Sequence, residues 1–341
     1  MRQGLSEVML GFMGEFDLIE TFFKRPARHA TLGVGDDCAL LGVTSGQQLA
    51  ISSDMLVEGR HFLSTVNPRH LGHKALAVNL SDLAAVGAEP LVFTLALSLP
   101  RVDEAWLAGF SGGLLRLADA HGCELVGGDT TQGPLNICIT VFGEVPPGDA
   151  LLRQNAQVGD DIYISGTVGD ARLALEVFRG TQALDGAAFE QARQRMEQPT
   201  PRVALGLALR AVANAAIDVS DGLLGDLGHI LKRSNVGAQI DTTWLQAAGS
   251  FGDARWPCGI TERLAELPWN KRLEFALAGG DDYELCFTAP VNQRELVHAA
   301  AWESDTPVTR IGRITQEQGL VVLDPQGQPI TRRFASFDHF A

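Results

Sequence analysis

The chain has 341 residues, of which 45% are hydrophobic and 20% are charged, and its formal net charge is −14. This length favours two domains over one, and the composition is that of a globular protein with a large buried core. The negative charge argues against non-specific nucleic-acid binding, and no uncharged apolar run reaches the roughly 18 residues that a membrane span requires.

Five scattered cysteines form no C-x-x-C pair, which indicates reduced thiols in a cytoplasmic protein rather than a disulfide framework or a zinc site. The first 13 residues lack the basic-then-apolar layout of a secretion signal. The net charge also restricts how the chain could bind an anion. To bind an anion, the chain would need backbone N–H groups, a few suitably placed cationic side chains, or metal ions.

In the first half of the chain, apolar strand-like runs alternate with helical runs rich in alanine and leucine, which is typical of α/β or α+β folds. Asp103 is placed to cap a helix, and Gly87 and Gly122 are placed to end helices. The expected elements, in order, are a helix at 16–23, a strand at 49–51, a helix at 73–86, a strand at 91–99, a helix at 103–121 and strands at 124–126 and 135–145.

The dipeptide Pro146-Pro147 and the glycine after it mark the best linker between two domains. Beyond it the same alternation returns, and Thr200 with Pro201 has the pattern of a helix start. The expected elements are a strand at 161–164, helices at 170–178, after 200 and at 222–234, a strand at 283–288 and a helix at 291–302, with 242–270 unassigned. We therefore predict an extension at 1–13, an N-terminal domain at 14–147 and a C-terminal domain at 148–341.

Aspartates lie at six places at the mouth of short apolar elements. These places hold Asp36 and Asp37, Asp54, Asp82, Asp129, Asp218 and Asp221, and Asp281 and Asp282. Carboxylate oxygens are the ligands that Mg²⁺ prefers, and Mg²⁺ commonly bridges protein carboxylates to phosphates. The sequence thus predicts a site in which metal ions, rather than lysines, neutralise an anionic ligand.

Asp82 is the most informative of these residues because its helix is apolar on nearly every face, as buried helices are. A buried carboxylate costs several kcal/mol unless it is paired or bound to metal. Asn79 lies three residues earlier on the same helix face. The alternative to a metal site is an ion pair, for which Lys74 is a candidate.

Several other features have structural alternatives. Ser220 or Asp221 could simply cap the helix that follows them, and Gly-Asp dipeptides are common in turns. The loop at 165–170 could hold an anion with its N–H groups or be only a tight turn. The usual phosphate motifs G-x-x-x-x-G-K-[ST] and G-x-G-x-x-G are absent.

The chain resembles the thiamine-monophosphate kinases in six motifs that keep the family's order and spacing from about residue 14 to the C-terminus. They lie at 33–40, 51–54, 74–88, 127–130, 217–223 and 279–285. The resemblance implies the fold shared with aminoimidazole ribonucleotide synthetase, which has two α/β domains and N-terminal sheets that pair across a homodimer. It also implies ATP, several Mg²⁺ ions and thiamine monophosphate as ligands, in the last step of thiamine diphosphate synthesis.

The resemblance further implies roles for individual residues. Asp281 replaces a glutamate of some relatives, and Phe337 stands at a variable aromatic position. The implied metal ligands are Asp37, Ser52, Ser53, Asp54, Asp82, Asp129, Asp218 and Asp221, of which Asp54, Asp82, Asp129 and Asp218 are the implied catalytic residues. The implied ATP contacts are Gly128, Asp129, Arg153 and Ser220, and the implied thiamine phosphate contacts are His61, Asp281 and Phe337.

The expected chemistry is direct in-line transfer of the γ-phosphoryl group of ATP. A phosphate monoester is already ionised at neutral pH, so the acceptor needs no strong general base. The alternatives are another ATP-dependent synthetase of the superfamily, of the selenophosphate or aminoimidazole ribonucleotide type, and a non-catalytic nucleotide-binding protein.

Overall fold

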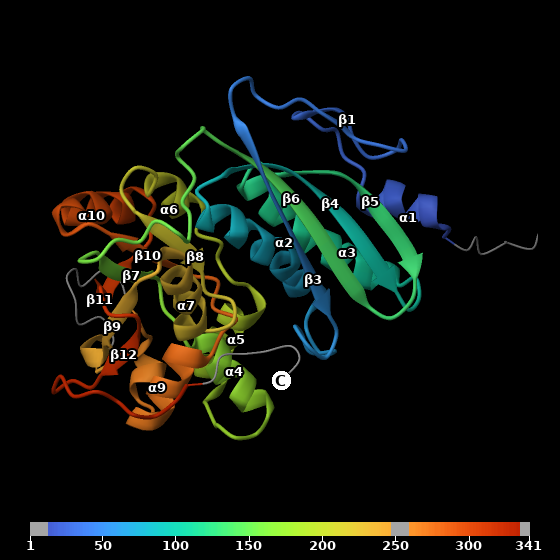
Figure 1. The fold of residues 1–341 in the computed structure, drawn as a ribbon. Coiled ribbons are helices and arrows are strands. Elements are labelled where there is room, and N and C mark those ends of the chain that lie inside the picture. Colours follow the sequence, from blue (N-terminus) through green and yellow to red (C-terminus); the bar gives the residue numbers. More distant parts are fainter. Residues whose placement is uncertain (1–12, 247–258, 335–341) are drawn as a thin grey trace, which may run out of the picture.

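The computed structural model describes residues 13–246 and 259–334, which form two α/β parts, each built on its own sheet (Figure 1). The N-terminal sheet has the strand order β3-β6-β4-β5, with β4 and β5 parallel and the other neighbours antiparallel. Its strands are β3 (Gln48–Val57), β6 (Asn136–Val145), β4 (Glu89–Leu99) and β5 (Glu124–Gln132). No helix among the described residues is long and apolar enough to cross a membrane.

Two long helices, α2 (Pro68–Ala85) and α3 (Glu104–Ala120), pack side by side behind this sheet (Figure 1). Asn67 begins α2, its side chain accepting a hydrogen bond from the N–H of residue 69, and Asp103 caps α3 as predicted. The helices approach closely at two glycines. A Cβ at Gly72 would collide with the carbonyl oxygen of Phe110 on the facing helix, so a side chain there would force the helices apart.

The opposite face of the N-terminal sheet is only partly covered. A short antiparallel ribbon of β1 (Ala30–Leu32) and β2 (Leu40–Leu41) packs on one end of it, and α1 (Glu15–Phe22) lies against α3 and β5. Along β3 the outward side chains of Leu49, Ile51 and Met55 remain 37%, 59% and 56% exposed. Within residues 13–246 and 259–334, this row of apolar side chains is therefore left largely uncovered.

The C-terminal sheet is mixed, with the strand order β12-β9-β11-β7-β10-β8, in which only β12 and β9 are parallel neighbours. Its strands are β7 (Asp161–Ser165), β8 (Ala215–Asp218), β9 (Gly237–Asp241), β10 (Leu285–Ala289), β11 (Val308–Thr315) and β12 (Gly319–Leu323). The helical segments around it are α4 (Asp170–Phe178), α5 (Gly186–Glu197), α6 (Val203–Ala208), α7 (Leu223–Ser234), η1 (Thr242–Leu245), α8 (Glu262–Ala265), α9 (Trp269–Ala278), η2 (Val291–Gln293) and α10 (Arg294–Glu303).

Helix α2 belongs to the cores of both parts. It contacts β3 and β6 on one side and α6 and β8 on the other, and the largest apolar cluster runs through it from Leu95 to Phe287. Burying each large apolar side chain contributes roughly 1.5–3 kcal/mol, so this continuous cluster joins the two halves. The predicted two-part α/β architecture and the buried character of α2 are therefore confirmed.

Some element boundaries predicted from the sequence are wrong. Strand β3 has ten residues rather than three, and β5 continues to Gln132, so Asp54 and Asp129 lie inside strands and not at their ends. Polar residues interrupt the apolar pattern of β3 and β5, although the backbone of each strand stays paired with the neighbouring strand past these residues. Helix α6 begins after Arg202 rather than at Thr200, and the helix expected at 291–302 begins as a 3₁₀ turn.

Candidate active site

The centre of the site is the contact between β3 and α2. Because side chains alternate along a strand, Ser52 and Asp54 both point inward toward the helix. The Ser52 hydroxyl donates to the Asp82 carboxylate, and the Asp54 N–H donates to the Asn79 side-chain oxygen at 3.1 Å. The Asn79 amide in turn donates to the carbonyl of Ala75, one turn earlier, at 2.9 Å. Asn79 and Asp82 thus share the helix face that meets β3.

The C-terminal half adds a third carboxyl group. Asp218 ends β8, and the Ser81 hydroxyl of α2 donates to it at 2.8 Å. Asp218 is 5% exposed. Its position matters because β8 is the edge strand of the second sheet, which α2 contacts. Helix α2 therefore brings together aspartates that lie more than 130 residues apart in the chain.

Burial and mutual repulsion hold these carboxyl groups in unusual states. Burial, with the charge of Asp82, raises the pKa of Asp54 to about 7. Burial, again with the charge of Asp82, raises the pKa of Asp218 to about 8. Burial also raises the pKa of Asp82, against the Ser52 hydrogen bond and the positive charge of Arg153. A cluster of this kind is short of positive charge.

The residues fit magnesium in a particular way. Within 13–246 and 259–334, no three His, Cys, Asp or Glu side chains already stand in a geometry that would hold a metal ion. Mg²⁺, however, usually keeps several waters and takes only one or two carboxylates, with substrate phosphates supplying other ligands. Oxygen donors that repel each other when charged suit such an ion, and a preformed protein cage is not required.

Two predicted ligands lie on the other face of the N-terminal sheet. Ser53 points away from α2, with its hydroxyl 3.0 Å from that of Thr140. The strand register places Asp129 in one row with Met55, on this same outer face but on β5, at the far side of the sheet from β3. Three strand spacings separate β3 from β5, or about 14 Å. A single chain does not bring Asp129 to Asp54.

Gly128 has a structural explanation of its own. Its φ of 147° favours glycine, and a Cβ there would collide with the carbonyl oxygen of Leu95 on the neighbouring strand β4. The sheet therefore requires glycine at this position whether or not ATP binds there. Asp37 is also placed apart from the carboxyl cluster. It is exposed between β1 and β2, with its N–H donating to Asp36 at 2.8 Å.

Asp226 organises the loop before α7, a role that was not predicted from the sequence. Its carboxylate accepts the N–H groups of Ser220, Asp221 and Gly222 at 3.0, 3.0 and 3.1 Å. Burial, opposed by these hydrogen bonds, raises its pKa to about 6. The alternative in which the side chain of Ser220 or Asp221 caps α7 is wrong. The N–H groups at the start of the helix are instead bound by Asp226, which lies inside the helix. The loop carries Ser220 and Asp221 just beyond Asp218.

A second group of predicted residues meets at Lys74. This buried lysine, considered above as a partner for Asp82, donates instead to Asp281 at 2.6 Å and to the His61 carbonyl at 3.3 Å. His61 also accepts the N–H of Val57 through Nδ1 at 2.9 Å. Asp281 has a φ of 63°, so its loop is held in a conformation that non-glycine residues rarely adopt. Phe337 lies outside the described residues.

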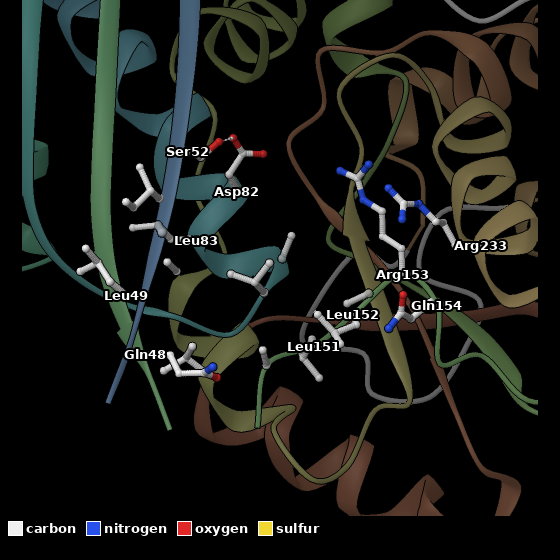
Figure 2. A pocket seen from close by; sticks show the side chains of 17 residues that line it. Gln48, Leu49, Ser52, Asp82, Leu83, Leu151, Leu152, Arg153, Gln154 and Arg233 are labelled. Carbon is white, nitrogen blue, oxygen red and sulfur yellow. Dashed lines mark hydrogen bonds between the residues drawn. The ribbon is translucent and has the colours of Figure 1, made fainter. Parts of the chain in front are cut away.

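A cavity of about 560 Å³ opens beside the carboxyl cluster (Figure 2). Ser52 and Asp82 lie on one wall, and Arg153 with Arg233 lies on the opposite wall. Its remaining lining is largely apolar and comprises Leu49, Ala50, Ile51, Leu83, Ala85, Val86, Val145, Ala150, Leu151, Leu152 and Ala216, with Gln48 and Gln154. The structure thus places Arg153 across from Asp82, at a site with room for a ligand of nucleotide size.

The glycine loop at 165–170 is held by hydrogen bonds to other segments of the protein. The N–H groups of Gly166 and Val168 donate to the carbonyls of Pro307 and Gly259, and that of Gly169 donates to the Asp282 carboxylate, at 2.8–3.0 Å. These donors are used within the protein, so the loop does not present them to an anion.

The chain is similar to known proteins along nearly its whole length. Residues 35–145 match the N-terminal domain of AIR synthase related proteins, and residues 157–324 match their C-terminal domain. The thiamine-monophosphate kinase of Escherichia coli K12 is 46% identical over 333 residues, which cover 96% of this chain and 98% of that protein.

Two solved structures are also similar. The thiamine-monophosphate kinase of Stenotrophomonas maltophilia is 47% identical with a TM-score of 0.79, covering 89% of this chain and 92% of that one. AaThiL complexed with AMPPCP and TMP is 28% identical with a TM-score of 0.71, covering 88% and 89%. Both parts of the fold and nearly the whole sequence agree, and the chain belongs to the thiamine-monophosphate kinases.

Proposed function

We propose that this protein transfers the γ-phosphoryl group of ATP to the phosphate of thiamine monophosphate, giving thiamine diphosphate and ADP, with magnesium required. Membership of the thiamine-monophosphate kinases supports this activity. The observation that carries the mechanism is the group of Asp54, Asp82 and Asp218, which draws on both halves of the chain and in which burial raises every pKa.

The proposed metal ligands nearest this group are Ser52, Asp54, Asp82 and Asp218. Bound magnesium would supply the positive charge that lets two phosphate groups approach and would orient them. The chain's own contribution is to hold the oxygen donors in place through Ser81, Asn79 and the backbone of β3. Asp221, beside Asp218, and Asp37, on its exposed loop, are proposed as further ligands that reach the ions when both substrates are bound.

The transfer itself is proposed to be in line. An oxygen of the thiamine monophosphate attacks the γ-phosphorus, the bond to the β,γ-bridging oxygen breaks, and ADP leaves with that electron pair. Two unit negative charges 4 Å apart repel by about 4 kcal/mol at an effective dielectric constant of 20, so positioning and charge are the main demands. The acceptor is already ionised, so no side chain needs to remove a proton.

The two substrates are assigned to different parts of the site. We place ATP in the cavity, near Arg153 and Ser220, and thiamine monophosphate near His61 and Asp281. Lys74 supports the second assignment, because it fixes His61 and Asp281 next to each other although they come from different halves. Phe337 is proposed as an additional contact to the thiamine ring.

We further propose a homodimer that pairs the outer faces of the N-terminal sheets. The exposed row of Leu49, Ile51 and Met55 supports such an interface, and Ser53 and Asp129 lie on the same face. Within one chain, the strand that holds Asp129 lies about 14 Å from the strand that holds Asp54. Pairing the faces would let Gly128 and Asp129 of one protomer serve the site of the other.

The dimer proposal has a direct test. Inactive Asp54→Asn and Asp129→Asn proteins, mixed and re-equilibrated, should regain activity in the mixed dimer, because one of its two sites keeps both aspartates. Continued inactivity of a mixture shown to contain mixed dimers would contradict shared sites. Ile51→Lys should give monomers in light scattering, since it buries a charge in the apolar interface.

We also propose the domain limits 14–147 and 148–341, after an extension at 1–13, and a cytoplasmic location. The matches at 35–145 and 157–324 fall on either side of the proposed boundary.

The activity is tested by ADP release with thiamine monophosphate, thiamine or neither, in magnesium and in EDTA. We expect release only with thiamine monophosphate and magnesium. Equal release with free thiamine would reassign the acceptor, and release without any acceptor would point to an ATPase.

A further inference from the structure

One cationic residue of the cavity is not explained by the roles proposed so far. Arg233 stands in the last turn of α7, and its side chain lines the same cavity as Arg153 (Figure 2). We propose that Arg233 binds the phosphate chain of ATP together with Arg153. This inference rests on the proposed ATP-dependent function and adds a nucleotide-binding residue to it.

The fold brings the two arginines together through the residue next to Arg233. The Ser234 hydroxyl donates to the carbonyl of Arg153 at 2.8 Å and accepts the N–H of Ala156 at 3.1 Å. This tie fixes the 153–156 segment to the end of α7. In Figure 2 the side chain of Arg233 extends from α7 toward the guanidinium group of Arg153.

This wall of the cavity carries two positive charges. Elsewhere in the described part of the chain several arginines pair with carboxylates, as Arg202 does with Glu284 and Arg294 with Asp161, each at 2.6 Å. In the described part of the chain, neither Arg153 nor Arg233 has an ion-pair partner within 4 Å. Two like charges on one wall, in a chain of net charge −14, indicate that the missing partner is an anionic ligand.

The rest of the cavity identifies the chemical class of that ligand. Apolar side chains that include Leu83, Val86 and Leu151 can cover a flat base, while Asp82, across the cavity from the two arginines, is suited to hold metal-bound phosphate. Guanidinium groups present a planar fork of N–H donors that matches phosphate oxygens. A nucleoside triphosphate with magnesium satisfies all three surfaces at once.

The simpler explanation of Arg233 is that a cation at a helix C-terminus interacts favourably with the helix dipole. Lys232 is the matched control for this explanation. It has the same charge in the same last turn and is exposed, but it does not line the cavity. A role in helix stability would make the two residues equivalent, whereas a role in phosphate binding would separate them.

The experiment compares Arg233→Gln, Arg233→Lys and Lys232→Gln in the full chain. Binding of magnesium–ATP, magnesium–ADP and adenosine is measured by calorimetry, and KM for ATP and for thiamine monophosphate by ADP release. Arg233→Gln should weaken ATP binding about tenfold or more, the loss expected for a charged hydrogen bond. It should leave adenosine binding and the KM for thiamine monophosphate within about twofold. Arg233→Lys should recover part of the loss, and Lys232→Gln should match wild type.

Two results would overturn the proposal: ATP binding by Arg233→Gln equal to that by Lys232→Gln, or an equal loss for adenosine and ATP. A wild-type protein that binds ATP but does not phosphorylate thiamine monophosphate would refute the proposed function instead. The calorimetric comparison would still decide the role of Arg233, because it does not depend on turnover.

Discussion

Replacing Asp218 by asparagine should lower activity and, in metal-free protein, raise stability. The carboxyl group is buried at the end of β8, and Ser81 donates to it at 2.8 Å, a hydrogen bond that an asparagine oxygen can also accept. The substitution therefore removes the charge and keeps the shape and the hydrogen bond. Loss of one charge-stabilising group in an active site commonly reduces turnover by about 10²-fold or more, and we expect that here.

The gain in stability follows from the raised pKa. Burial, with the charge of Asp82, raises the pKa of Asp218 to about 8 from an ordinary 3.8. Between these values the unfolded chain has released the proton and the folded chain still holds it. The stability due to this group is thus fully present below pH 4 and is lost progressively as the pH rises to about 8. At pH 7 the loss is on the order of 4 kcal/mol, at about 1.4 kcal/mol for each pKa unit.

The assay is thermal unfolding in EDTA from pH 4 to pH 9, with and without excess Mg²⁺. The Asp218→Asn protein should melt at a higher temperature than wild type at pH 8, by about 5–10 °C, and at a similar temperature at pH 4. Magnesium should raise the melting temperature of wild type more than that of the variant, because the ion binds the folded carboxylates.

Asp161→Asn is the matched control, because this aspartate is equally buried on nearby β7 but is paired. Hydrogen bonds from Arg294 and Arg310, at 2.6–3.2 Å, overcome burial and lower the pKa of Asp161. The contribution of Asp161 to stability is present above pH 4 and is lost as the pH falls through the lowered pKa. Asp161→Asn should therefore destabilise the protein at pH 7 by about 1–3 kcal/mol and leave turnover intact. Near-normal turnover of Asp218→Asn, or lower stability than wild type in EDTA at pH 8, would refute the reasoning.

Three further outcomes are expected from single substitutions. Lys74→Met should raise KM for thiamine monophosphate more than KM for ATP, and combining it with Asp281→Asn should add little, since each change removes one charge of the same ion pair at 2.6 Å; additive losses would show that the pair does not act as a unit. Gly128→Ala should lower the melting temperature even without ligands, because its Cβ would meet the carbonyl of Leu95. A variant that is as stable as wild type and deficient only in ATP binding would show that the glycine serves the ligand and not the sheet. Asp226→Asn should reduce turnover while circular dichroism stays native, because the weaker acceptor loosens the loop at 220–222; unchanged turnover would remove this loop from the site.

The burial of helix α2 was predicted correctly from the sequence, because a helix that is apolar on nearly every face is stable only when it is surrounded by protein. It predicted β3 and β5 poorly, because Ser52, Asp54 and Asp129 interrupt runs that backbone hydrogen bonds nevertheless continue. The strand period then decides which neighbours share a site. Ser52 and Ser53 are adjacent in the chain, yet they face opposite sides of the sheet. A sequence motif does not show which of its residues lie on which face.

Contacts between distant segments explain what the sequence could not supply. Lys74 and Asp281 are 207 residues apart, so their pairing depends on the complete fold. Asp226 looks like an ordinary surface residue of a helix until the loop before α7 turns three N–H groups toward it. Arg233 gave no signal at all, because only the tie through Ser234 places it beside Arg153.

Helix α2 shows why the site needs both halves of the chain. Four of its polar residues each contact a different structure: Lys74 contacts Asp281 in the loop before β10, Asn79 the backbone of β3, Ser81 the carboxylate of Asp218, and Asp82 the Ser52 hydroxyl. All of them are held by apolar packing that continues into both sheets. The same packing excludes water and so makes the aspartates costly to charge. A change that loosened α2 from either half should therefore weaken the proposed binding of magnesium in two ways. It would separate the carboxyl groups, and it would let solvent screen the repulsion that a bound ion relieves.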